Sequence, residues 1–176
     1  NNFKTLLIDE KNELGGATIY QNKEFNKINN QGSSDWIKKE INELKNISNL
    51  EIKTRTSVAA YHGYNFLLAR ENLTDHLEKK DKNNKVRQRL LKIRAKKVIL
   101  ATGALERPLV FNNNDRPGII LSTAVKKYAD FFGVKCGEKN IFFTNNDSAY
   151  ESALCLHYKG IKVDAIVDIR DNSNSN

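Results

Sequence analysis

The stretch KVILATGALERPLVFNNNDRPG, from Lys97 to Gly118, decides the fold of this chain. It begins with a short apolar run, Val98 to Ala101, which is typical of a strand buried on both faces of a parallel sheet. Thr102 and Gly103 follow, and a glycine there lets the backbone turn sharply and approach a ligand closely. Both prolines of the chain come just beyond this turn, so we expect a stiff, extended connection after it.

The composition restricts the class of protein. The 176 residues include no methionine, even at position 1, which favours an internal piece of a longer chain. The net charge is +8, and the segment from Glu78 to Lys97 carries ten Lys or Arg against two acids. No helix-turn-helix, zinc-finger or aromatic stacking pattern accompanies this excess. We therefore expect a solvated loop and strand face there, with an acidic partner subunit as the alternative, and no nucleic-acid partner.

The two cysteines, Cys136 and Cys155, form no CxxC pair and have no metal-ligand spacing around them. We expect both to be buried, reduced thiols of a cytoplasmic protein, and we predict no metal site. No apolar run approaches the length of a membrane span, and no signal peptide is visible. The sequence therefore predicts no membrane partner.

The first strand indicated by the sequence is Thr5 to Ile8, and Asp9 and Glu10 follow its carboxyl end. An acid at this place in a parallel sheet can accept hydrogen bonds from the ribose hydroxyls of an adenosine, although an ordinary solvated pair fits these two residues equally well. The run Leu14-Gly15-Gly16 supports the ribose interpretation, since it would bring backbone beneath a nucleotide. The glycine-rich turn that would cradle a pyrophosphate is expected upstream of residue 1.

The middle of the chain predicts one helix and a series of strands. The helix begins at Ser33 or Ser34 and runs through Leu44. Alternation then predicts strands at 50–53, 56–61, 65–71 and 87–94, with a polar loop at 79–85 inside a small antiparallel excursion. Val58 is either an adenine-facing residue or a plain β-residue.

The last third predicts a helix at 122–132 and then a βαβ unit. Its parts are a strand at 140–143, a turn at 144–148, a helix at 149–159, and a strand at 163–167 that ends at Asp168. Thr144 and Asn146 stand where a GxGxxG turn would have glycines, and only Ala149 keeps the small side chain. We expect these side chains to keep a pyrophosphate away, so this second nucleotide site should be degenerate.

These elements predict an α/β fold of the FAD/NAD(P)-binding Rossmann-like, three-layer type, with a small antiparallel β excursion, lacking its first strand and glycine-rich turn. Residues 1–108 would be the C-terminal part of a first dinucleotide-binding domain, from its second strand onward. Residues 109–138 would form a connection and a helix, and residues 139–176 the start of a second, degenerate domain. No nucleophile, acid and base are spaced as a catalytic group, so no catalytic residue is predicted.

Two phrases, RQRLLKIRAKKVILATGALERPLVFNNNDRPGI and IFFTNNDSAYESALCLHYKGIKVDAIVDIR, resemble the α subunits of heterotetrameric sarcosine oxidase, and the likeness extends over nearly the whole chain. The turn TNND is the most discriminating feature, and ERPLVF followed by NDRPG is the next. Related amine and opine oxidase subunits and hydrogen cyanide synthase subunits share part of this pattern and are the nearest alternatives.

The resemblance implies a complex that demethylates sarcosine to glycine, with formaldehyde or methylene-tetrahydrofolate and hydrogen peroxide as further products. It implies NAD, with FAD as the alternative, in this subunit, and FAD and FMN with tetrahydrofolate as acceptor in the whole complex. The other subunits and a small amine substrate are the implied partners. Amine oxidation would take place on a β subunit with covalent flavin, so the catalytic centre would lie outside this segment.

The resemblance also implies a cofactor site in the first domain. Its ribose contacts would be Asp9, Glu10 and Lys11, its backbone contacts Gly16 and Ala17, its adenine contact Val58, and its closing turn Thr102 and Gly103. A self-contained FAD-dependent NAD(P)H oxidoreductase is the alternative, although the TNND turn counts against a working nicotinamide site. The third hypothesis is an assembly scaffold whose nucleotide groove is empty.

Overall fold

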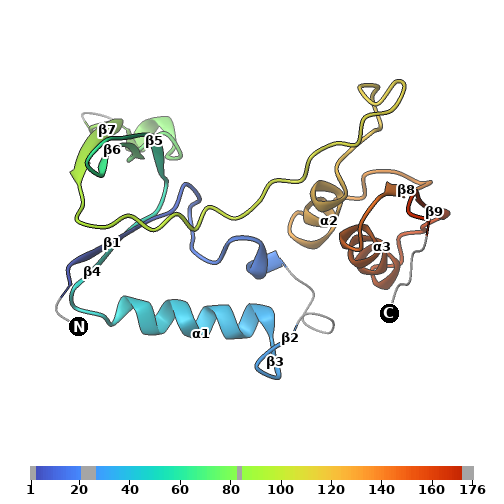
Figure 1. Ribbon diagram of the computed structural model, residues 1–176, viewed down its shortest axis with the longest axis horizontal. Coiled ribbons are helices and arrows are strands. Elements are labelled where there is room, and N and C mark those ends of the chain that lie inside the picture. Colours follow the sequence, from blue (N-terminus) through green and yellow to red (C-terminus); the bar gives the residue numbers. More distant parts are fainter. Residues whose placement is uncertain (1–2, 21–26, 83–84, 172–176) are drawn as a thin grey trace. The chain divides into compact units, whose positions relative to one another are not determined.

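The computed structural model describes residues 3–20, 27–82 and 85–171 (Figure 1). The chain divides into two compact units. The first contains residues 1–19 and 27–102, and the second contains residues 20–26 and 103–176. After residue 27 the division falls between Thr102 and Gly103, in an irregular segment that follows the apolar run.

The first unit is built on a β-α-β crossover. Strand β1 (Thr5–Ile8) runs parallel to β4 (Leu50–Lys53), and Ile8 lies opposite Lys53 at their carboxyl ends. Helix α1 (Ser33–Lys45) connects them and contacts β4, after the short strands β2 (Lys27–Ile28) and β3 (Gln31–Gly32). Apolar residues recur along one side of α1 and are half-buried, namely Trp36, Ile37, Ile41 and Leu44. The predicted strands at 5–8 and 50–53 and the predicted helix between them are confirmed.

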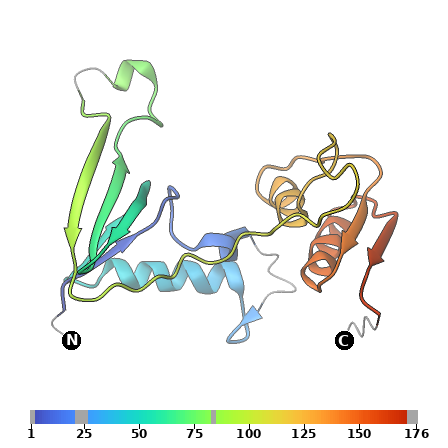
Figure 2. The ribbon, with the colours of Figure 1, turned by 45° about the horizontal axis from the view of Figure 1, so that its top comes forward.

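The predicted antiparallel excursion is also confirmed. Strands β5 (Thr56–His62), β6 (Phe66–Asn72) and β7 (Gln88–Arg94) form one sheet with β6 in the centre (Figure 2). The connection from β6 to β7 includes a short 3-10 helix, η2 (Lys79–Asp81). Side chains alternate along β6, and Leu67 and Ala69 are buried on the same face.

Two expectations were wrong. The run from Val98 to Ala101 is not a buried strand: Ile99 is 88% exposed and Leu100 69% exposed. Apolar sequence favours burial, but a strand also needs a neighbouring strand for its backbone, and none of the described strands pairs with this run. Cys136 is exposed rather than buried, because it lies in the irregular segment after α2, away from the apolar core.

The second unit contains the predicted βαβ motif. Strand β8 (Ile141–Thr144) leads into helix α3 (Ser148–Tyr158), and β9 (Ala165–Asp168) returns parallel to β8. Helix α2 (Ser122–Asp130) packs against α3. The core is a single cluster of Ala129, Phe142, Ala149, Ala153 and Leu156. Ion pairs from Lys126 to Glu151 and from Lys159 to Asp130 join the two helices.

Among the described residues, none of the helices combines the length and the apolar character that a bilayer crossing requires.

Candidate functional site

The carboxyl end of β1 holds Asp9 in a fixed position. Its backbone N–H donates to the carbonyl of Lys53 at 2.9 Å, and its own carbonyl accepts from the N–H of Thr56 at 2.9 Å. The chain at Asp9 is thus tied to the end of β4 and the start of β5. Its half-buried side chain accepts a 2.9 Å hydrogen bond from the Lys11 N–H at Oδ1, while Oδ2 accepts none from the described residues. One carboxylate oxygen therefore remains for a ligand at the edge of the parallel pair.

The two residues after Asp9 continue the same edge. Glu10 is exposed, and the carbonyl of Lys11 accepts a 2.7 Å hydrogen bond from the N–H of Arg55. The three predicted ribose contacts therefore occupy one short loop, anchored through Arg55 and Thr56.

The LGG run forms a tight turn after this loop. Leu14 is buried, and a 3-10 helix, η1 (Gly16–Tyr20), follows. Gly15 has a φ of +114°, and a Cβ there would lie 2.7 Å from Cγ1 of Ile19 and 3.0 Å from Cγ1 of Ile37. Only glycine fits this backbone and this space. Gly16 also has a positive φ, +56°, and Ala17 is exposed at the first turn of η1.

The other predicted cofactor contacts, Val58, Thr102 and Gly103, are not part of the loop after β1 or of the LGG turn. Val58 is on β5 opposite Ala69, next to a register shift at Val58 and Ala60, and is 44% exposed. Thr102 is the last residue of the first unit, and Gly103, with a φ of +71°, is the first residue of the 103–176 segment of the second unit. Within the first unit, Asp9, Glu10 and Lys11 share the loop after β1, Gly16 and Ala17 lie at the start of η1, and Val58 lies in the antiparallel sheet.

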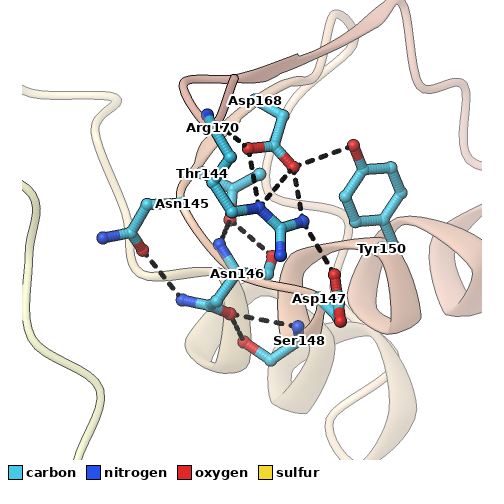
Figure 3. Close-up of polar contacts among 8 residues, drawn as sticks. All are labelled: Thr144, Asn145, Asn146, Asp147, Ser148, Tyr150, Asp168 and Arg170. Carbon is cyan, nitrogen blue, oxygen red and sulfur yellow. Dashed lines mark hydrogen bonds and ion pairs between the residues drawn. The ribbon is translucent and has the colours of Figure 1, made fainter. Parts of the chain in front are cut away.

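The turn between β8 and α3 satisfies its own polar groups (Figure 3). The Thr144 hydroxyl accepts from the Asn146 N–H at 3.1 Å and donates to the Asn146 carbonyl at 2.9 Å. Oδ1 of Asn146 accepts from the Ser148 N–H at 3.0 Å and from the Ser148 hydroxyl at 2.5 Å. A side chain therefore occupies the first N–H of α3, which an incoming phosphate would need.

Arg170, which we did not predict as a functional residue, fills the neighbouring position (Figure 3). Its Nη2 lies 2.6 Å from Oδ2 of Asp168 and 2.7 Å from Oδ1 of Asp147, and its Nε donates to both oxygens of Asp168. The Tyr150 hydroxyl donates to Asp168 as well, at 3.1 Å. Hydrogen bonds from Arg170 hold the pKa of Asp168 well below its usual value. The acid at the end of β9 is therefore engaged by a guanidinium.

The spacing Asp168-x-Arg170 was the one signal in the sequence that could have revealed this pair. Its second partner, Asp147, lies 23 positions away and adds a negative charge at the start of α3. Among residues 3–20, 27–82 and 85–171, no three His, Cys, Asp or Glu side chains gather as metal ligands.

The chain is similar to three curated proteins, each called sarcosine oxidase subunit alpha. The two from Corynebacterium sp., strains P-1 and U-96, are each 38% identical, over 167 and 169 residues. The one from Rhizobium meliloti strain 1021 is 34% identical over 167 residues. These alignments cover 95–96% of this chain but only 16–17% of the relatives, so the chain spans about one sixth of their length.

The fold is similar to a solved structure, that of L-proline dehydrogenase from P. horikoshii. The TM-score is 0.69 and the sequence identity 26%, and the match covers 92% of this chain and 30% of that one. No protein-family model matches the chain.

Proposed function

Since this chain is related to a segment of sarcosine oxidase subunit alpha, as its sequence predicted, we propose that it is part of such an oxidoreductase subunit and that its first unit binds the dinucleotide. The whole complex would demethylate sarcosine to glycine, with formaldehyde or methylene-tetrahydrofolate and hydrogen peroxide as the other products. FAD and FMN would act in other parts of that complex, and the catalytic centre would lie outside this segment.

The fold we propose is the Rossmann-like, three-layer FAD/NAD(P)-binding type. Residues 1–108 would belong to a first dinucleotide-binding domain, 109–138 to a connection and helix, and 139–176 to a second, degenerate domain. The parallel pairs β1–β4 and β8–β9, each with a helix in its connection, support this proposal.

The observation that carries the dinucleotide proposal is the position of Asp9. Its carboxylate stands at the carboxyl end of a parallel strand, with Oδ1 engaged by a backbone N–H and Oδ2 open. The vicinal hydroxyls of a ribose are hydrogen-bond donors that match this oxygen, whereas a 2′-phosphate would be repelled. NAD fits this requirement, and so does FAD, because both have a free adenosine 2′-hydroxyl.

The other proposed contacts follow from their places in the first unit and at its end. Glu10 and Lys11 would assist Asp9, and the backbone of Gly16 and Ala17 would pass close to the cofactor. Val58 would face the adenine, and Thr102 and Gly103 would close the pocket.

The second unit would not bind a nicotinamide nucleotide. Arg170 engages Asp168, and the Asn146 side chain satisfies the start of α3. These contacts favour an oxidase subunit over a self-contained FAD-dependent NAD(P)H oxidoreductase, which would need both sites. The same contacts are compatible with one dinucleotide bound in the first unit and no second nucleotide bound in the second unit.

The experiment is to heat-release small molecules from the full-length protein and identify them by mass spectrometry. The wild type should contain one adenine dinucleotide per chain. Asp9→Asn should bind the dinucleotide about 10- to 150-fold more weakly and retain correspondingly less, since loss of a charged hydrogen-bond acceptor weakens binding by about 1.5–3 kcal/mol. Glu13→Gln, at an exposed acid of the same loop, is the matched control and should retain all of it. Absence of any adenine dinucleotide, or full retention by Asp9→Asn, would contradict the proposal.

A further inference from the structure

The antiparallel sheet of the first unit separates its charges between two faces. Cross-strand pairing places Phe66 opposite Arg94, Leu68 opposite Lys92, and Arg70 opposite Leu90. Because side chains two residues apart in a strand point to the same side, these six residues share one face, which we call the basic face. The opposite face carries Leu67 and Ala69, which are 7% and 0% exposed. The basic face is therefore the open side of the sheet.

No acid lies on the basic face. The three strands contain one acidic residue, Glu71, and alternation places it on the opposite face. Its side chain is 12% exposed and forms ion pairs with Lys53 at 3.0 Å and Arg89 at 3.4 Å. The charge of Glu71 is thus engaged elsewhere, and the cations on the basic face are not balanced within the sheet.

The cations of the basic face are available to a partner. Arg70 and Lys92 are exposed and make no ion pair or side-chain hydrogen bond with the described residues. The Arg94 guanidinium lies 5.2 Å above the Phe66 ring and donates to the carbonyl of Tyr64 at 3.4 Å, so its position is already set. A prearranged arginine loses less entropy on binding than a freely rotating side chain.

An apolar residue stands among these cations. Leu90 is 62% exposed, and Leu68 beside it on β6 is half-buried. Apolar residues flanked by arginine and other polar groups are typical of a protein interface. The aromatic ring of the basic face, Phe66, is half-buried and lies under the Arg94 guanidinium, so it is not free to stack on a base. The exposed apolar residue Leu90 also differs from the row of cations that a phosphate backbone would need, so the composition favours a protein partner.

We propose that the basic face, formed by Phe66, Leu68, Arg70, Leu90, Lys92 and Arg94, docks an acidic surface of a partner polypeptide. This inference rests on the proposed role of the chain as part of a multisubunit oxidase. Carboxylates of the partner would pair with Arg70 and Lys92, and an apolar side chain would cover Leu90. Such pairing raises the association rate and makes it sensitive to salt.

The test uses the full-length protein, expressed with its partner subunits, and the double charge reversal R70E/K92E. We expect this variant to associate with the partner subunits about tenfold more slowly at low salt, with a flatter dependence on salt than the wild type. The neutral variant R70Q/K92Q should give an intermediate rate. The control K4E/K79E changes the net charge equally, at two exposed lysines outside the three strands, and should assemble as the wild type does.

If R70E/K92E and K4E/K79E assembled at equal rates, this result would contradict the docking inference but not the proposed dinucleotide site. The dinucleotide content of R70E/K92E, measured in the same preparations, should equal that of the wild type. This result would show that the first unit of the variant is folded. It would also keep the test of the docking face independent of the test of the cofactor site. Binding of a 30-base-pair DNA by the wild type in physiological salt, lost in R70E/K92E while subunit assembly is unchanged, would also overturn the inference in favour of a nucleic-acid surface.

Discussion

Thr123 donates two hydrogen bonds to Glu106, from its backbone N–H at 2.8 Å and from its hydroxyl at 2.6 Å, both to Oε2. Ser122 contacts Oε1 in the same way, at 3.2 and 2.8 Å. The residue before α2, Leu121, has no side-chain oxygen, so a carboxylate 16 and 17 positions upstream supplies the cap. Glu106 thereby ties the extended segment after Gly103 to α2 within the second unit.

We predict that Glu106→Gln loosens α2 by about 1 kcal/mol, the usual loss when a helix cap is removed. Burial raises the pKa of Glu106, but the hydrogen bonds from Thr123 and Ser122 outweigh it and leave the pKa below its ordinary value. A carboxyl group with a lowered folded-state pKa stabilises the fold above its unfolded pKa, about 4.3, and loses this effect as the pH falls further. The stability difference should therefore be full at pH 7 and should diminish below about pH 4.

Hydrogen exchange of the α2 amides in the full-length protein measures this difference. Glu138→Gln is the control, because Glu138 is exposed and its pairing with Lys135 is a surface ion pair of small energy. Equal protection of α2 in Glu106→Gln and the wild type at pH 7 would show that the cap is unimportant.

Arg170→Gln should destabilise the second unit without creating a nucleotide site. The Asp168 side chain is only 6% exposed and would lose its guanidinium partner. The pKa of Asp168 is held low mainly by Arg170, so their pairing stabilises the unit above about pH 4 and fades as the pH falls below that value. The unfolding temperature at pH 7 should fall by several degrees.

Arg116→Gln, at an exposed arginine, is the matched control and should melt like the wild type. NADPH should still fail to bind Arg170→Gln, because Asn146 continues to occupy the start of α3. Stoichiometric NADPH binding to this unit in calorimetry would refute the degenerate-site prediction.

Local patterns predicted most of the elements, because alternation and helical periodicity report which side chains need burial. The strands β1 and β4, the helix α1 and the βαβ motif of the second unit lie within two residues of their predicted bounds. The same reasoning failed at Val98 to Ala101, since an apolar run shows a need for burial but not whether a neighbouring strand is present. It failed at Cys136 because residue type sets an average burial, whereas position in an irregular segment decides the actual one.

Some residues of the candidate site could likewise be placed from the sequence, and others could not. Asp9 could be placed from sequence because the end of a parallel strand is a defined position in any sheet of this kind. Glu106 could not, since its partner Ser122 lies 16 positions away and meets it only after folding. For Arg170 the spacing to Asp168 was visible in the sequence, but the contact with Asp147, 23 positions away, was not. The basic excess at 78–97 was visible in the sequence, but only the register of β6 and β7 shows that Arg70 joins Lys92 and Arg94 on one face.

Gly15→Ala should destabilise the first unit by about 1–3 kcal/mol, a typical value for a non-glycine residue forced into a strained backbone region. The new Cβ would also meet Ile19 at 2.7 Å, so the turn would have to shift. Gly63→Ala is the control, because Gly63 has open space around it and no positive φ. Denaturant unfolding distinguishes the two variants, and a Gly15→Ala protein as stable as Gly63→Ala would contradict the steric argument.

The two cysteines should differ sharply in reactivity. Cys155 is 2% exposed, and burial together with the hydrogen bond that its thiol donates to Asp130 raises its pKa to about 12. Thiolate is the reactive form, so at pH 8 Cys155 should resist iodoacetamide in the folded protein, whereas the exposed Cys136 should be alkylated within minutes. Peptide mass spectrometry after a short pulse of iodoacetamide measures the alkylation of each cysteine separately.

Addition of denaturant should raise the alkylation rate of Cys155 to that of Cys136, because unfolding removes both the burial and the neighbouring carboxylate. Rapid labelling of Cys155 without denaturant would mean that α3 opens locally, and the packing of α3 against α2 would then be weaker than their shared core and ion pairs imply.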